Sequence, residues 1–297
     1  MAEIIFISDI LLISLAFLWI FAASFTDLKK REVPNWLSFS LIFIALAIRG
    51  LAALIEKQPL YFLYGLTALA IFFLLANLFY YTRIFGGGDT KLLMALSVVF
   101  ATKPSFIMEL QEYTLLGFNE PFLMIFLINS FVLGSIYGLV FSVVAALKNK
   151  KFHKEYNKIS KKMRFIRTLF WLVAFVCLVF AFFSSKWFFA IFAVLFVTPP
   201  LYSFIKAAEN SAMIKELSAR EIREGDWITK PIRVKNRIIK PSIHGLTKKD
   251  ISLIKKSRKK ITVKYGLPFV PVFLLALIVS LFVGDLLFIV VNFLFGI

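Results

Sequence analysis

Long apolar runs separated by basic clusters set the pattern of this chain. A membrane-spanning helix needs roughly 20 mostly apolar residues. A shorter run, 92–101, follows three glycines and is extended by residues 103–108. Seven other runs are long enough to span: 10–26, 36–55, 61–81, 122–147, 165–183, 187–205 and 267–283. The pattern predicts an all-α polytopic membrane protein with about eight transmembrane helices.

Composition agrees with a membrane protein, since 60% of the 297 residues are hydrophobic against about 45–50% in soluble domains. The first run has neither a basic segment before it nor a small-residue cleavage site after it. We therefore expect it to remain as a span and not to be removed as a signal peptide.

Basic residues gather on one side of the expected membrane. The eight-span arrangement puts 31 of the 35 Lys and Arg on one face and leaves four on the other. Because basic loops stay on the cytoplasmic side, both termini are expected outside and the basic loops inside. The net charge of +18 then reflects topology and contact with membrane lipids, and nucleic acid is not an expected partner.

One sizeable polar region, 207–264, interrupts the apolar runs. Short alternating stretches and a Thr247–Asp250 capping-box spacing predict a small α+β cytoplasmic domain there. The expected organisation is a membrane core of five spans at 1–147, a basic linker with two spans at 148–206, this domain at 207–264 and a last helix at 265–297.

Two aspartates lie at the expected cytoplasmic face. Asp27 closes the first apolar run, and Asp89 follows Gly86, Gly87 and Gly88 after the third. Taken singly, Asp27 is an interfacial acid beside a basic loop and Asp89 caps a helix. Together they can share one proton, because neighbouring like charges do not both ionise easily. One carboxylate then activates water while the other polarises a peptide carbonyl.

The residues around both aspartates resemble a known family. Residues 86–89 resemble the G-x-G-D signature of GxGD membrane aspartyl proteases, and residues 27–35 resemble the D-x-K/R-x-K/R-x-I/V-P-N pattern of type IV prepilin peptidases. The two aspartates are 62 positions apart, in the family's order. Residues 224–228, 244–247 and 266–271 resemble the C-terminal region of archaeal members.

This resemblance implies a prepilin or preflagellin peptidase with Asp27 and Asp89 as the catalytic pair. The implied substrates are precursors with type IV pilin-like signal peptides, such as prepilins and pre-archaellins. The supporting loop would contain Gly86, Gly88 and Lys91. Residues with a substrate-side or structural role would be Lys29, Arg31, Pro34, Asn35, Pro268 and Pro271. Lys29, Arg31 and Lys91 also fit as topology signals.

No cofactor or metal is expected. His153 and His244 lie in separate polar segments, and Cys177 is the one cysteine, so neither a zinc site nor the paired CxxC motifs of bacterial relatives can form. N-methyltransferase activity is therefore not expected.

Two other functions stay open. A transporter or channel would use intramembrane acids as an ion relay, and another GxGD protease would cut helices inside the bilayer. Asp9 and Asp285 are expected near the outer face of the membrane. Asp285 lies 18 residues after the start of the last apolar run, which is about 27 Å along a helix. Gly134 and Gly138 have the spacing of a helix-packing motif.

Overall fold

The computed structural model describes residues 3–105, 121–183, 186–219, 221–222, 224–234, 237–242, 245–257 and 260–295. The chain divides into two compact units, which are described separately. The first contains Met1–Tyr137 and Gly266–Ile297, and the second contains Gly138–Tyr265.

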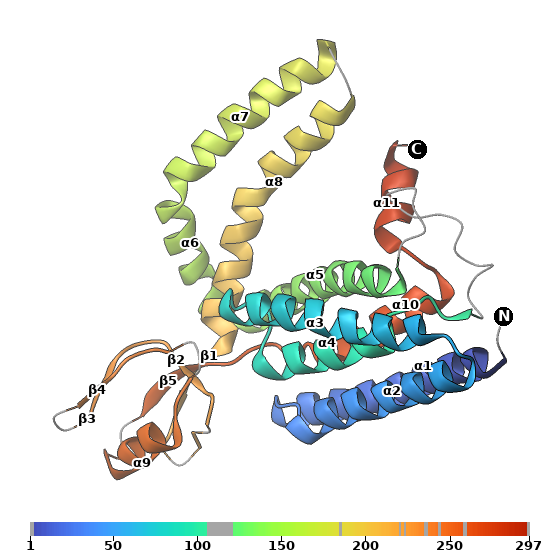
Figure 1. Ribbon diagram of the computed structural model, residues 1–297. Coiled ribbons are helices and arrows are strands. Elements are labelled where there is room, and N and C mark those ends of the chain that lie inside the picture. Colours follow the sequence, from blue (N-terminus) through green and yellow to red (C-terminus); the bar gives the residue numbers. More distant parts are fainter. Residues whose placement is uncertain are drawn as a thin grey trace. The chain divides into compact units, whose positions relative to one another are not determined.

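Helices make up the described part of the first unit. They are α1 (Glu3–Lys30), α2 (Asn35–Ile55), α3 (Pro59–Tyr81), α4 (Gly87–Val99), the first part of α5 (Phe122–Lys148), α10 (Val270–Phe282) and α11 (Leu286–Phe295). Helices α1, α2 and α3 each pack against α4, and α1 also packs against α10 (Figure 1). Leu92, Leu93 and Leu96 have no exposed surface, so α4 is the central element of the unit.

A buried polar network secures the C-terminal end of α4. Arg49 donates hydrogen bonds to the carbonyls of Val98 (2.7 Å), Val99 (3.0 Å) and Tyr61 (3.2 Å). The Tyr61 hydroxyl in turn donates to Asp9 at 2.7 Å. The last carbonyls of a helix have no partner within it, so Arg49 supplies the donors that the end of α4 requires.

Asp9 and Asp285, which are expected near the outer face of the membrane, are both buried within the protein, and their depth in the membrane stays a prediction. Their exposed fractions are 4% and 2%. Asp285 occupies the break between α10 and α11, where it accepts N–H groups of Leu287 (2.8 Å) and Phe288 (3.2 Å). It therefore caps the first turn of α11.

The fold class predicted from the sequence is confirmed: the chain is a multi-pass, mainly helical membrane protein. Among the described residues, six helices are long and apolar enough to cross a membrane, and α10 with α11, bent by 66°, would make a seventh. The eighth expected span corresponds to α4, which has 13 residues and a length of about 20 Å against a bilayer core of about 30 Å. Residues 106–108 of that expected span lie outside the described residues.

The helical part of the second unit contains α6 (Phe152–Lys162), α7 (Arg164–Phe183) and α8 (Lys186–Ala208). Helices α7 and α8 lie side by side as a hairpin (Figure 1). The basic linker expected at 148–167 is thus largely helical. Phe152 is buried on α6 and packs edge-on against Phe204 of α8, with ring centroids 5.2 Å apart.

A small sheet region follows α8 and a π-helical turn, η2 (Glu209–Met213). Strands β1 (Ile214–Leu217), β5 (Ile261–Lys264) and β2 (Trp227–Ile228) form an antiparallel sheet in that order, and β3 (Ile232–Val234) pairs with β4 (Arg237–Ile239). Helix α9 (Lys248–Ser257) begins at the capping box, where Asp250 accepts the N–H of Thr247 at 3.1 Å. The predicted α+β region is confirmed.

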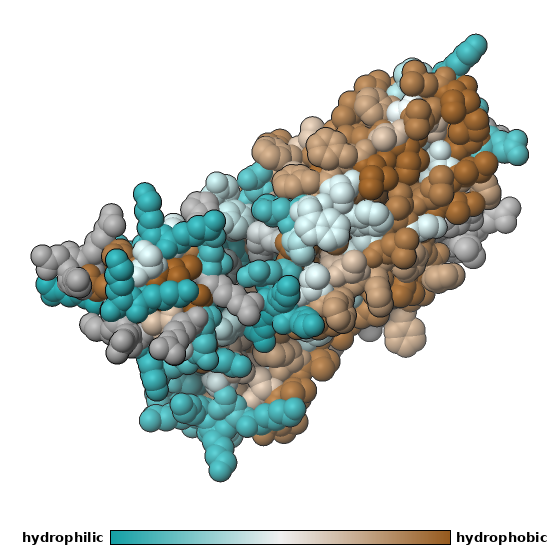
Figure 2. All heavy atoms as spheres, turned by 90° about the horizontal axis from the view of Figure 1, so that it is seen from below, coloured by the Kyte–Doolittle hydropathy of each residue, from teal (hydrophilic) through white to brown (hydrophobic). Residues whose placement is uncertain are grey.

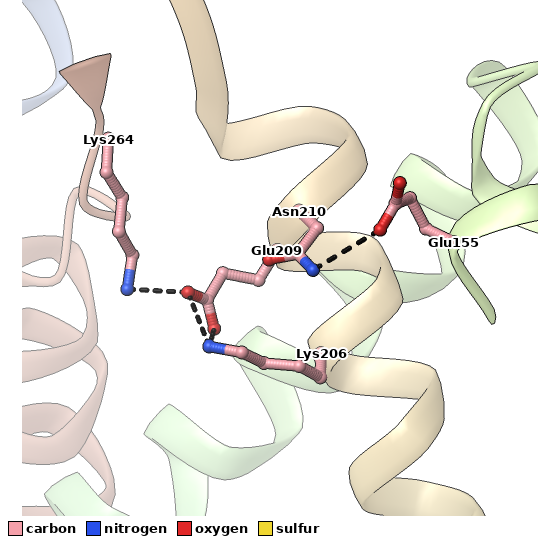
Figure 3. A network of polar contacts seen from close by, with 5 residues as sticks. All are labelled: Glu155, Lys206, Glu209, Asn210 and Lys264. Atoms are coloured by element: carbon pink, nitrogen blue, oxygen red, sulfur yellow. Dashed lines mark hydrogen bonds and ion pairs between the residues drawn. The ribbon is translucent and has the colours of Figure 1, made fainter. Parts of the chain in front are cut away.

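A charged network ties this sheet to the helices of the same unit. Glu209 accepts hydrogen bonds from Lys206 (2.9 Å) at the end of α8 and forms an ion pair with Lys264 (2.6 Å) on β5 (Figure 3). Asn210 donates to Glu155 of α6 at 3.5 Å. One carboxylate therefore links α8 with the central strand of the sheet.

The surface of each part matches its expected surroundings. On the face drawn in Figure 2, apolar residues cover much of the helical part, and hydrophilic residues are frequent among the coloured residues of the small sheet region. On α7 the exposed apolar residues include Phe165 (79%) and Phe175 (63%). Apolar surface of this extent on a helix suits contact with lipid.

Candidate active site

Asp27 lies in the last turn of α1 and is 5% exposed. Its Oδ2 accepts the backbone N–H of Val270, the first residue of α10, at 3.1 Å. The first N–H groups of a helix have no partner within it and carry a partial positive charge. Residues 243 positions apart in the chain thus meet in a contact suited to a carboxylate.

Asp89 is the third residue of α4. Its Oδ2 accepts the N–H of Gly86, the N-cap residue, at 3.1 Å. The Thr90 hydroxyl donates to the carbonyls of Gly86 (3.2 Å) and Gly87 (3.0 Å). The glycine loop is therefore fixed to the first turn of the helix that carries Asp89.

The two carboxyl groups are close enough to interact. Asp89 keeps some exposed surface, yet burial of its carboxyl raises its pKa to about 7, and the negative charge of Asp27 adds to the increase, against the hydrogen bond from Gly86. A protonated carboxyl next to an ionised one is the arrangement that aspartic proteolysis requires.

Gly88 allows the two motif segments to meet. A Cβ atom at this position would lie 3.1 Å from Cβ and 3.3 Å from the backbone N of Val33. The loop after α1 and the glycine loop before α4 therefore approach each other more closely than a side chain at position 88 would allow. Close beside this contact, Lys91 donates to the Asn35 side chain at 2.7 Å, and Pro34 is the N-cap residue of α2.

Arg31 connects the loop after α1 with the segment before α10. Its φ is 57°, in the left-handed region that few residues other than glycine and asparagine adopt. Its Nη1 donates to the carbonyl of Gly266 at 3.1 Å, and its charge acts on Asp27. Arg31 therefore has a structural contact in addition to its charge.

The remaining residues expected near the site have varied positions. Lys29 is exposed and lies over the ring of Phe25, 5.7 Å from its centroid. Pro271 is in the first turn of α10, where a missing N–H costs little. Pro268 precedes that turn, and His244 lies outside the described residues.

Sequence reasoning missed an aromatic group beside Asp27. Phe269, the residue before Val270, packs on Phe85 with ring centroids 4.9 Å apart and on Phe273 at 5.4 Å. Phe85 also stacks on Phe131 of α5 at 5.8 Å. Phe85 directly precedes the glycine loop, and this position was the one feature of the sequence that could have indicated an aromatic group near the site.

These residues set the chemistry available at the site. It offers two carboxyl groups held by backbone N–H groups at two helix N-termini, and the pKa of Asp89 is raised to about 7. Among the described residues, no group of three or more His, Cys, Asp or Glu is arranged to hold a metal ion. The arrangement can take a proton from water and donate a hydrogen bond to a carbonyl at the same time.

Comparison with known proteins agrees with the resemblance seen in the motifs. Residues 14–139 match the model of the type IV leader peptidase family. The matched range contains both aspartates, the loop at 31–35 and the glycine loop. The resemblance to this family, inferred above from two short motifs, is confirmed over that range.

A curated relative points the same way. Prepilin peptidase EppA of Methanothermobacter thermautotrophicus is 31% identical over 118 residues. The match covers 40% of this chain and 30% of the length of that relative. No solved structure matches the chain.

Proposed function

We propose that this chain is a membrane aspartic endopeptidase that removes the short basic leader of type IV pilin-like precursors. Prepilins and pre-archaellins are the substrate class. The meeting of Asp27 and Asp89 carries the proposal, because burial and the charge of Asp27 raise the pKa of Asp89 to about 7. Two such carboxyl groups at the ends of spans form a water-activating pair.

The pair would hydrolyse the peptide bond without a covalent intermediate. One carboxylate takes a proton from water as the water oxygen attacks the scissile carbonyl. The other carboxyl donates a hydrogen bond to the carbonyl oxygen, where negative charge develops. We assign no N-methyltransferase activity to the chain.

The distribution of basic residues supports a cytoplasmic position for the site. The loop containing Lys29, Lys30 and Arg31 and the loop containing Arg83 would both stay inside under the rule that basic loops are cytoplasmic. With α4 and the residues after it counted as the eighth crossing, both termini would lie outside, and the basic region at 207–264 would face anionic lipid headgroups.

The first prediction concerns the aspartates. Asp27→Asn and Asp89→Asn should each abolish cleavage of a purified precursor in detergent, and the double variant should be no worse, because the two groups act as a unit. Asparagine keeps the size of the side chain but neither takes nor shares a proton. The measurement is the mobility shift of the precursor on a gel over time.

Asp285→Asn is the matched control, since Asp285 caps α11 and is outside the pair. It should cleave at close to the wild-type rate. A correctly folded Asp27→Asn or Asp89→Asn enzyme with near wild-type cleavage would refute the mechanism. Ion flux into vesicles that contain the protein, without cleavage of the precursor, would instead favour a transporter or channel. Cleavage within the transmembrane helix of the substrate would favour a different GxGD protease.

A further inference from the structure

We propose that the first turn of α10, held in place by Phe269 seated against Gly134, keeps Asp27 as the ionised base of the pair and leaves Asp89 as the protonated acid. Phe269, Val270 and Gly134 are then positioning residues for catalysis. This assignment rests on the proposed function, in which the two aspartates form the pair.

The position of Asp27 makes an external source of positive charge necessary. Asp27 lies at the C-terminal end of its own helix, where the helix dipole disfavours a negative charge. The α10 N-terminus reverses this effect, because the Val270 N–H donates to Oδ2 at 3.1 Å and the Phe269 N–H also acts on the carboxylate. Arg31 adds a full positive charge nearby.

Burial opposes ionisation of both carboxyl groups, and Asp89 has fewer contacts than Asp27 that offset it. One backbone hydrogen bond, from Gly86, favours its ionised form, but burial and the charge of Asp27 outweigh it and raise its pKa to about 7. Arg31, in the loop after α1, acts on the charge of Asp27. The charge of Asp27 in turn acts on Asp89 of α4 and on Tyr137 of α5. When one proton is shared, Asp89 is the better place for it.

The contact between Phe269 and Gly134 sets where the α10 amides lie. A Cβ atom at position 134 would lie 2.6 Å from both Cε2 and Cζ of the Phe269 ring, well inside van der Waals contact. The ring has little room to retreat, since it packs on Phe85 at 4.9 Å and Phe273 at 5.4 Å. A side chain at 134 would therefore shift Phe269 and with it the adjoining N–H of Val270.

The assignment defines every proton transfer. Asp27 removes a proton from water as the water oxygen bonds to the scissile carbon, and the Asp89 proton passes to the carbonyl oxygen. The resulting diol then collapses: its hydroxyl returns a proton to Asp89, the C–N bond breaks, and Asp27 gives its proton to the leaving nitrogen. Both carboxyl groups finish in their starting states, with one water consumed.

The test titrates each carboxyl alone and needs no cleavage. Asp89→Asn retains Asp27, and Asp27→Asn retains Asp89. Infrared difference spectra against the double variant isolate the protonated carboxyl signal of the remaining aspartate in each. We expect this signal to disappear in Asp89→Asn at a pH at least one unit lower than in Asp27→Asn. Equal midpoints, or the reverse order, would overturn the assignment.

A second titration tests whether the packing of Phe269 against Gly134 positions the N–H of Val270. In the Asp89→Asn background, Gly134→Ala should raise the titration midpoint of Asp27 by about one pH unit, the size expected for weakening one hydrogen bond to a charged acceptor. Gly138→Ala is the matched control one turn along α5, because nothing lies within 4 Å of a Cβ there. Adding Phe269→Leu to Gly134→Ala removes the clash and should restore the midpoint.

Val270→Pro gives an independent variant in case Gly134→Ala does not fold. Proline has no N–H, so Val270→Pro deletes the donor. It also disfavours the helical conformation of Phe269, the residue before it, and both changes should raise the Asp27 midpoint. Unchanged midpoints in both variants would refute the positioning role. Loss of the proposed protease function would be seen separately, as cleavage that survives Asp27→Asn or Asp89→Asn.

Discussion

The raised pKa of Asp89 makes the stability of the folded protein depend on pH. Burial and the charge of Asp27 raise the pKa of Asp89 in the folded protein to about 7, above the ordinary value of 3.8 for an aspartate. The folded protein therefore holds a proton between these two pH values that the unfolded chain releases. Since the unfolded state binds fewer protons, stability falls as pH rises through this window and stays low above pH 7.

We predict that Asp89→Asn is more stable than the wild type at pH 8. The gain should be about 2–4 kcal/mol, from roughly 1.4 kcal/mol per pH unit with allowance for partial exposure of the residue. It should shrink as pH falls through the window and vanish near pH 4. Melting temperatures in detergent across pH 4–8 measure the effect.

The exposed carboxyl of Glu32 provides the comparison. Glu32→Gln should change stability little at any pH, because exposed charges contribute weakly. A difference between Asp89→Asn and wild type that does not vary with pH would contradict the raised pKa.

At the same scale, the sequence located both aspartates but not their partners. Their motifs are short and local in the chain, and Gly88 of the second motif permits the close approach of Val33. The N–H of Val270 lies 243 positions from Asp27. Backbone donors have no residue signature, so no local pattern could have identified this one.

The orientation of α4 depends on both of its ends. Its N-terminus carries Asp89, and its C-terminal carbonyls bond to Arg49, which has no exposed surface. Arg49 also lies over the ring of Tyr61, with Cζ 4.5 Å from the centroid. A planar guanidinium makes several bonds in fixed directions that an ammonium group does not reproduce.

Arg49→Lys should therefore destabilise the protein although it conserves the charge. Loss of one or two buried hydrogen bonds from a charged donor predicts about 2–4 kcal/mol and a melting temperature lower by roughly 5–10 °C. Cleavage should weaken as well, because α4 carries Asp89. The measurement is thermal unfolding in detergent, followed by the precursor cleavage assay.

Arg164→Lys, at an exposed position at the start of α7, is the matched control and should leave both measurements unchanged. If Arg49→Lys behaved like this control, the buried network would have no role in securing α4.

The element that the sequence did not reveal is α6. Its residues were interpreted as a basic linker because lysines dominate the segment. A short charged helix is marginal alone, and here Phe152 supplies an apolar anchor by packing on Phe204. The contact joins residues 52 positions apart, so tertiary packing decides whether this helix forms.

Orientation in the membrane is a property of the whole chain. With both termini outside, the loop between α2 and α3 would face outward and α6 would face the cytoplasm. In a Cys177→Ser background, a cysteine at Gln58 should react with an impermeant thiol reagent added to intact cells. A cysteine at Asn157 on α6 should react only after the cells are opened.

Labelling of Asn157→Cys from outside would overturn this orientation and place the aspartate pair on the wrong face for a cytoplasmic peptidase. Both positions are exposed and lie in polar segments next to spans. A difference in their labelling by the impermeant reagent therefore reports on which side of the membrane each one lies. Cleavage activity of each variant checks that the fold is intact.

The structure groups the segments of the chain differently from the division expected from the sequence. The sequence suggested a core at 1–147 and a separate last helix at 265–297, a division that stays a prediction. In the structure, Gly266–Ile297 belongs to the same compact unit as Met1–Tyr137. The last segment supplies the N–H groups that contact Asp27, which explains why residues from the two ends of the chain form one site.

The sequence by itself determined the membrane class, most of the spans and the α+β region, and it gave the two aspartates as candidates for the site. These follow from runs of apolar residues, the placement of basic residues and short motifs, all of which are local. Only the tertiary structure decided that α4 is a short buried helix, that α6 forms, and that Phe269 sits against Gly134 beside Asp27. Those features depend on contacts between distant segments, and their energy comes from packing and hydrogen bonds that exist only when the helices are assembled.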